Sequence, residues 1–306
     1  MIRFITARAA RAVATLLVVV IVAFVLARMA GDPVLLMLPP EAPPDQVEAT
    51  RASLGLDEPI VIQFFYFLGG AMTGDFGDSI RQGAPALDIV LERLPYTLEL
   101  AIGSFLLGFG AAVAVAVWGE LSPYPAVRNA MLWVATARQA IPPYLFGILM
   151  ILVFSIWLGM LPAIGRTSYA SYVLPIVTIA TFEVALYLRL INGSFAKSRN
   201  EDYVRTALAK GASRTRVVLT HQLPNALVPL ITVAGVNLGV LLGGLVVLET
   251  VFNWPGLGRL IVQGVEQRDY PVVQAGVLVI AIIFVVINFV VDMLYAVIDP
   301  RVRVTK

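Results

Sequence analysis

The residue types that carry most enzyme chemistry are scarce in this 306-residue chain. It has no cysteine and one histidine, His221, so a histidine-based metal site or a Ser-His-Asp triad would depend on that single residue. None of its three lysines, Lys197, Lys210 and Lys306, follows a glycine, so the phosphate-binding loop G-x-x-x-x-G-K-S/T is absent. We therefore expect no cofactor and no metal in this chain. An ATP-driven process would need a separate polypeptide as its ATPase.

Two ionisable residues, Arg138 and Glu183, stand in apolar stretches, where a charge is costly without a partner. At a rise of 1.5 Å per residue they lie about 13 and about 12 Å from the same end of two predicted helices. Equal depth and opposite charge predict an ion pair, or a shared water-filled cavity near an inner gate. The alternative is that Arg138 reaches lipid headgroups and Glu183 meets another subunit.

The composition predicts an integral membrane protein. Hydrophobic residues make up 59% of the chain and charged residues 14%, whereas soluble domains have about 45–50% and about 25%. A bilayer core requires about 20 apolar residues per helix, and no period-2 alternation indicates a barrel. We predict an all-α fold with six transmembrane helices, near residues 9–30, 97–118, 129–158, 171–191, 225–248 and 273–295.

The first apolar run has a second interpretation. Arg3, Arg8 and Arg11 precede the charge-free residues 12–27, as in a cleaved signal peptide. No small-x-small cleavage site precedes a polar segment, which favours a membrane helix.

Lysine and arginine are concentrated in three segments that we predict to be cytoplasmic. Three lie in the N-terminal segment, six in residues 192–224 and three at the C-terminus, whereas residues 31–94 have three against ten acids. We therefore place both termini and residues 192–224 in the cytoplasm. The predicted organisation is a first transmembrane helix (1–30), a proline-rich extracytoplasmic cap (31–94), a five-helix core (95–298) and a cytoplasmic tail (299–306).

The connection 198–224 has the pattern of two short helices. Ser198 and Glu201 form a potential capping box before a helix at about 200–210. Gly211 can take the left-handed conformation that ends a helix, and Ser213 can cap a second one. We expect Pro224 to separate that second helix from the next span.

The short helix has one apolar face, which carries Tyr203, Ala207 and Leu208. A solvated basic loop would explain the segment equally well from physics alone. The other interpretation is a small amphipathic helix that docks into a groove on a partner.

The run from Asp202 to Gly211, followed by Leu223-Pro224, resembles the EAA loop of ABC-importer permeases. Arg205 and Thr206 replace the Glu and Ala of the general pattern, as in the peptide/nickel class. Further segments resemble the same class along the whole chain: 31–33, 55–59, 74–77, 94–100, 249–258 and 292–301.

This resemblance implies a type I importer permease that pairs with a second, homologous permease and two cytoplasmic ATPase subunits. ATP and Mg would act in those ATPases, and an extracytoplasmic binding protein would deliver the substrate, typically a short peptide. The expected location is a bacterial or archaeal plasma (inner) membrane, without nucleic acid, and the mechanism is alternating access. The ATPase-coupling residues implied by the loop are Tyr203, Ala207, Leu208, Lys210, Gly211, Leu223 and Pro224.

The segment after the fifth span, with Phe252, Trp254 and Pro255-Gly256, is expected to be re-entrant at the outer mouth, as a gate or as a packing bend. Pro142-Pro143 should kink or interrupt the third helix. Glycines at 239, 243 and 244 allow close approach to the fifth helix, which favours helix packing over the alternative of approach by a substrate. The candidate residues for a gate or translocation path are Arg138, Glu183, Glu249, Phe252 and Trp254.

Two other function classes compete with a transporter subunit. An ATP-independent channel or ion-coupled carrier would need no docking loop. An intramembrane hydrolase would need a nucleophile with a base, or paired metal ligands, within the bilayer, and the sequence offers neither pattern.

Overall fold

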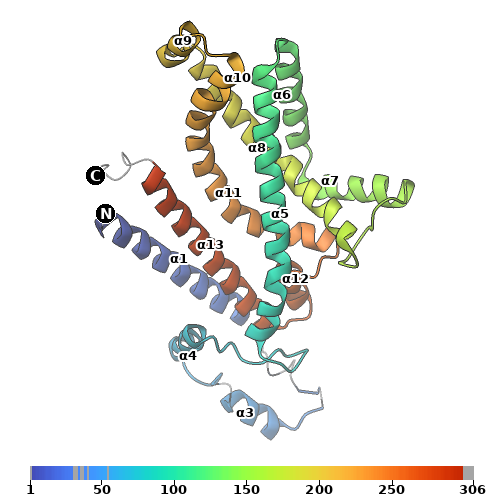
Figure 1. The fold of residues 1–306 in the computed structure, drawn as a ribbon. Coiled ribbons are helices and arrows are strands. Elements are labelled where there is room, and N and C mark those ends of the chain that lie inside the picture. The colour runs from blue at the N-terminus through green and yellow to red at the C-terminus, as the bar shows by residue number, and fades with distance from the viewer. Residues whose placement is uncertain (1, 30–33, 35–37, 40, 54, 299–306) are drawn as a thin grey trace. The chain divides into compact units, whose positions relative to one another are not determined.

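The computed structural model describes residues 2–29, 34, 38–39, 41–53 and 55–298, and the motif at 31–33 and the tail 299–306 lie outside them. The described residues are mainly helical (Figure 1), with one isolated antiparallel bridge between Asp78 and Pro85. Five of their helices are long and apolar enough to cross a membrane, and a bent pair raises the number to six. The predicted all-α fold is confirmed.

The long helices agree with five predicted spans and extend beyond most of their predicted ends. They are α1 (Ile2–Met29), α5 (Ala86–Leu121), α8 (Val173–Ser198), α11 (Leu223–Val251) and α13 (Tyr270–Ile298). The shorter helices are α3 (Pro44–Ser53), α4 (Ile60–Thr73), α6 (Pro125–Ala140), α7 (Pro143–Met150), α9 (Asp202–Ala209), α10 (Arg214–Val217) and α12 (Leu257–Glu266).

The predicted span 129–158 is broken. Helix α6 ends at Ala140, and α7 begins at Pro143 at an angle of 98° to it. Pro142 and Pro143 have no N–H to continue the helical ladder, and their rings exclude a straight helix. Of the two predicted outcomes, a kink or an interruption, the structure shows the interruption. A π-helical segment, Ile151–Trp157, continues α7.

The chain divides into two compact units. Unit 1 contains residues 1–97 and 255–286, and unit 2 contains residues 98–254 and 287–306. The core of unit 1 lies where the start of α5 packs on α12 and α13, and its fully buried side chains include Val90, Leu257 and Ala275. Helix α12 was not predicted.

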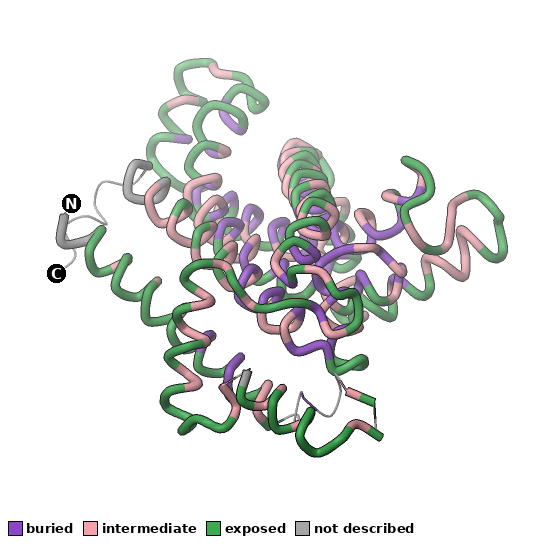
Figure 2. The backbone as a smooth tube through the Cα atoms, turned by 90° about the horizontal axis from the view of Figure 1, so that it is seen from below, coloured by how far each residue is buried: buried purple, intermediate pink, exposed green. Residues whose placement is uncertain are grey.

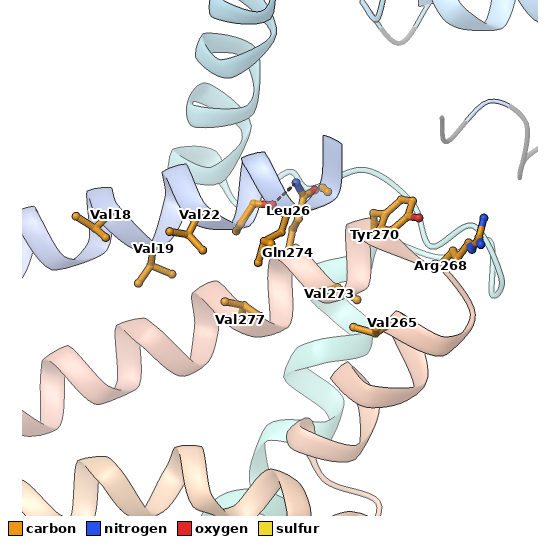
Figure 3. Close-up of a pocket in the computed structure, with 12 residues that line it drawn as sticks. Val18, Val19, Val22, Leu26, Val265, Arg268, Tyr270, Val273, Gln274 and Val277 are labelled. Carbon is orange, nitrogen blue, oxygen red and sulfur yellow. Dashed lines mark hydrogen bonds between the residues drawn. The ribbon is translucent and has the colours of Figure 1, made fainter. Parts of the chain in front are cut away.

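Unit 1 also holds α1 and the two cap helices α3 and α4. Phe24 of α1 packs edge-to-face on Phe64 of α4, with ring centroids 5.4 Å apart. Between α1, α12 and α13 lies a cavity of about 510 Å³, and six of its twelve lining residues are valines (Figure 3). Much of α1 is exposed (Figure 2), including Leu17, Val18 and Val22, as expected of a helix that faces lipid.

A set of hydrogen bonds, here called the latch, joins the loop at residues 79–81 to the turn at residues 267–269. The Ser79 hydroxyl donates a hydrogen bond to the buried Asp269 carboxylate at 2.5 Å, and the Ile80 N–H donates to the same carboxylate at 3.1 Å. Arg81 donates to the carbonyl oxygen of Gln267. The latch fixes the cap loop to the turn before α13.

Helix α8 is the centre of unit 2, where it packs against α6 and α11. Its buried face includes Tyr187, Leu188, Ile191 and Phe195.

Two glycines that were not predicted to do so lie in close helix contacts, Gly235 and Gly108. A Cβ on Gly235 of α11 would collide with the side chain of Val291 on α13, and one on Gly108 of α5 would lie 2.8 Å from Glu183 Cβ. Gly243 and Gly244 make no close helix contact within the described part of this chain, because a Cβ at either position would meet nothing within 4 Å.

Candidate functional site

The connection between α8 and α11 folds as a short helix, a sharp turn and a second helix (Figure 1). Helix α8 runs as far as Ser198, and Glu201 is the N-cap of α9 without a side-chain cap bond. The predicted capping box of Ser198 and Glu201 is therefore wrong, because the Ser198 hydroxyl donates to the Phe195 carbonyl inside α8.

Gly211 makes the sharp turn. Its φ of +81° is left-handed, as the sequence predicted, and its N–H donates to the Leu208 carbonyl at 2.9 Å. Ser213 then caps α10, because its hydroxyl accepts a hydrogen bond from the Arg216 N–H. A π-helical segment, Val218–Gln222, continues α10 directly into α11. The predicted break at Pro224 is wrong, because the helical run continues through it. Pro224 has no N–H to donate to the preceding turn, and the wider π turn lies directly before it.

An ion pair anchors this element to the rest of unit 2. Arg199, which follows α8, donates two hydrogen bonds to the Glu120 carboxylate at the end of α5, where Glu120 is 3% exposed. These bonds raise the pKa of Arg199 above its usual value, although partial burial opposes them. Arg214 of α10 donates to the Glu120 carbonyl oxygen at 2.8 Å. Gln222 donates to the buried Ser198 hydroxyl at 3.0 Å.

Glu120 was not among the predicted site residues. Its sequence signal is that it is the first acidic residue after the charge-free run 100–119, at a helix end, but the sequence does not reveal its partners. We call Glu120, Arg199 and Arg214 the base clamp.

Helix α9 turns apolar groups outward although it is anchored. The Val204 side chain is buried, whereas the side chains of Tyr203 and Leu208 are 38% and 49% exposed. Ala207 is half-buried, and Lys210 and Gly211 are exposed. Leu223 is half-buried and Pro224 is exposed at the start of α11. The predicted coupling residues thus lie on one element, on which Tyr203 and Leu208 present apolar surface to solvent.

The hypothesised ion pair between Arg138 and Glu183 does not form. Arg138 donates to the Thr181 hydroxyl at 3.0 Å and to the Thr178 carbonyl at 2.9 Å, and its guanidinium lies 3.8 Å from the Phe146 ring centroid. Thr181 and Glu183 are two residues apart, which is about 200° around α8. Arg138 therefore contacts one face of α8, and the Glu183 side chain leaves the helix on another face.

Glu183 is in a different polar cluster. It is 4% exposed, and it accepts a hydrogen bond from the Asn237 amide of α11. The same amide donates to the Tyr187 hydroxyl at 3.1 Å. Glu183 and Asn237 line a cavity of about 140 Å³ between α7, α8 and α11.

Glu249, Phe252 and Trp254 are all buried, at 0%, 2% and 0% exposed. A Cβ on Gly147 of α7 would lie 3.1 Å from the Phe252 ring. The Trp254 ring packs edge-to-face on Tyr172 with centroids 4.7 Å apart. These residues are packed side chains in this structure, and their gating role stays a prediction.

Known proteins resemble the chain along its whole length. The glutathione transport system permease protein GsiC of Escherichia coli (strain K12) is 41% identical over 308 residues, which cover 99% of each chain. The protein of the same name from Shigella flexneri serotype 5b (strain 8401) is equally similar.

Solved structures share the fold at lower identity. An inward facing conformation of the MetNI methionine ABC transporter has a TM-score of 0.56 at 22% identity, covering 69% of this chain and 96% of the other. An amino acid ABC transporter with histidines has a TM-score of 0.53 at 16% identity, covering 70% and 94%.

Two families match adjacent parts of the sequence. The family described as the N-terminal part of binding-protein-dependent transport system membrane components matches residues 1–101. The family of binding-protein-dependent transport system inner membrane components matches residues 104–304. The chain therefore belongs to this family of multi-pass inner membrane components, the permease subunits of ABC importers.

Proposed function

We propose that the chain forms one half of a translocation path for short peptides and is driven by cytoplasmic ATPase subunits that bind the 198–224 element. A second, homologous permease would form the other half, and an extracytoplasmic binding protein would deliver the substrate. The two termini and the 198–224 element would face the cytoplasm. The observation that carries this proposal is the clamped element with its outward apolar side chains, in a chain of this family.

The geometry of α9 suits docking. Tyr203 and Leu208 present apolar surface that a groove on a partner would cover, and such amphipathic helices bind in grooves. The base clamp holds the element on α5 and α8, so a force on α9 would reach the membrane helices. Gly211 fixes the angle between α9 and α10.

The sequence supports a division of labour with an ATPase. The chain has no G-x-x-x-x-G-K-S/T loop, so the energy of ATP would enter through a partner. The peptide class is supported by the two GsiC relatives, whose named substrate, glutathione, is a tripeptide.

Photo-cross-linking tests the docking site. Because the chain has no cysteine, an introduced cysteine is the only thiol in the chain that can be labelled. A Leu208→Cys variant, labelled with a maleimide that carries a photoreactive group, should cross-link to an ATPase subunit in membranes. The matched control is Met72→Cys on the cap helix α4, which is also exposed and should yield no such product.

ATP dependence separates the proposal from a channel or ion-coupled carrier. Uptake into vesicles that contain the chain, its partners and the binding protein should stop when ATP is withheld. Equal uptake without ATP, or cross-linking from Met72→Cys instead of Leu208→Cys, would contradict the proposed function.

A further inference from the structure

The cavity beside Glu183 is the strongest unassigned site in unit 2. A carboxylate within a membrane span is costly unless a partner or a cation stabilises it. The hydrogen-bond partners of Glu183 are the Asn237 amide and the Tyr187 hydroxyl, and both are neutral. Among the residues that the structure describes, no arginine or lysine forms an ion pair with Glu183.

We propose that Glu183 and Asn237 form a binding site for the protonated amino group of the transported solute. The proposal rests on the proposed function, because it assumes that this cavity opens onto the translocation path. It assigns to this chain a share in substrate selection, in addition to that of the binding protein.

The chemistry of the two side chains favours an ammonium group. The two bonds that Asn237 donates, to Glu183 and Tyr187, use both hydrogens of its amide, so Asn237 has no N–H left for a ligand and only its carbonyl oxygen remains, as an acceptor. The Glu183 carboxylate supplies the negative charge and acceptor oxygens that the charged N–H donors of an ammonium group require.

A hard metal ion fits the site less well. Calcium takes six to eight oxygen ligands, whereas the described residues contain no group of three or more His, Cys, Asp or Glu that could hold a metal. The apolar walls, such as Ile179, Leu245 and Leu248, supply no further oxygen from their side chains.

The size and opening of the cavity also fit one end of a solute. Its volume of about 140 Å³ is below the range of about 300–1,000 Å³ that holds a whole drug-sized ligand. It therefore accommodates the amino end of a peptide while the remainder lies outside. Gly244 lines the cavity on an exposed part of α11, and a Cβ there would meet nothing within 4 Å, so the wall is open at this point.

Saturation-transfer NMR on the whole transporter in nanodiscs tests the proposal, with alanyl-alanine and its N-acetyl form as probes. We expect alanyl-alanine to bind about 10- to 100-fold more tightly than the acetylated peptide, because acetylation removes the charged donor. Glu183→Gln should remove this difference by weakening alanyl-alanine alone.

Matched variants distinguish a site from a general disturbance. Gly244→Leu should fill the cavity and weaken alanyl-alanine, whereas Gly243→Leu, which is next to it, equally open and outside the lining, should not. Glu92→Gln removes an exposed carboxylate of α5 and should bind as the wild type does.

Three results would overturn the proposal: no binding of alanyl-alanine by the wild type, equal binding of the two peptides, or unchanged binding by Glu183→Gln. The Leu208→Cys cross-link and ATP-dependent uptake are measured on the same preparations. If both persist while the peptide results fail, only this inference falls; if both fail, the proposed function falls.

Discussion

Replacing Glu120 with glutamine should loosen the 198–224 element without unfolding the membrane helices. The variant keeps the size of the side chain but loses the charge that accepts two hydrogen bonds from Arg199. Hydrogen bonds to charged groups contribute about 1.5–3 kcal/mol each, and a glutamine oxygen still accepts one. Arg199 regains some water because its side chain is 32% exposed. The expected loss of local stability is about 2 kcal/mol.

Hydrogen–deuterium exchange of the purified transporter measures this loss. A decrease of about 2 kcal/mol should speed the exchange of protected amides in residues 202–217 about 30-fold, since about 1.4 kcal/mol is a factor of ten. Amides in the centre of α8 should exchange at the rate of the wild type. ATP hydrolysis should continue while uptake per ATP falls, because the loosened 198–224 element would shift on α5 and α8 and move these membrane helices less.

The matched control is Glu201→Gln, which removes an exposed carboxylate whose side chain makes no cap bond. Its effect should stay within about 0.5 kcal/mol. If Glu120→Gln exchanged no faster than Glu201→Gln, the base clamp would not hold the element. Faster exchange along the whole chain would instead show that Glu120 supports the entire fold.

The remaining predictions concern the turn and the helix contacts. Gly211→Val should strain a left-handed backbone by about 1–2 kcal/mol and uncouple ATP hydrolysis from uptake, while the chain still inserts into the membrane. Gly211→Asn should retain most uptake, because asparagine tolerates the left-handed conformation. Normal uptake by the valine variant would count against the docking role. Ser213→Ala should remove the cap of α10 and destabilise the element by about 1 kcal/mol, measured as faster exchange at 214–217; unchanged exchange would refute it. Gly235→Leu should collide with Val291 and lower the thermal midpoint of the purified transporter, whereas Gly243→Leu should not; equal midpoints would refute that contact.

The spans were predictable because hydropathy alone identifies long apolar helices. Helix α12 was missed because it has only 10 residues and is not a span. Pro142 and Pro143 predicted an interruption of the third helix as one alternative, and the structure has it. The angle of 98° could not be predicted, because it depends on the packing of α7 against α8 and α11.

The candidate site was predictable where local conformation decides it. Gly211 and Ser213 act through their own backbone and near neighbours, so the sequence pattern identified both. The pairing of Arg138 with Glu183 failed because sequence position gives depth in the membrane but not the partner that each helix face meets. Glu120 was missed for the same reason, since its bond to Arg199 joins residues 79 positions apart.

The π-helical segment 218–222 makes α10 and α11 one uninterrupted run of 38 residues, about 57 Å long at 1.5 Å per residue. One end carries Arg214 of the base clamp, and the other ends beside the packed ring of Phe252. If the proposed ATPase docks on the 198–224 element, a displacement of the end that carries Arg214 would be transmitted along this continuous helix to its far end. The helix would bend most easily at the wider π turn and at Pro229 within α11, and bending there would reduce the displacement that reaches the far end.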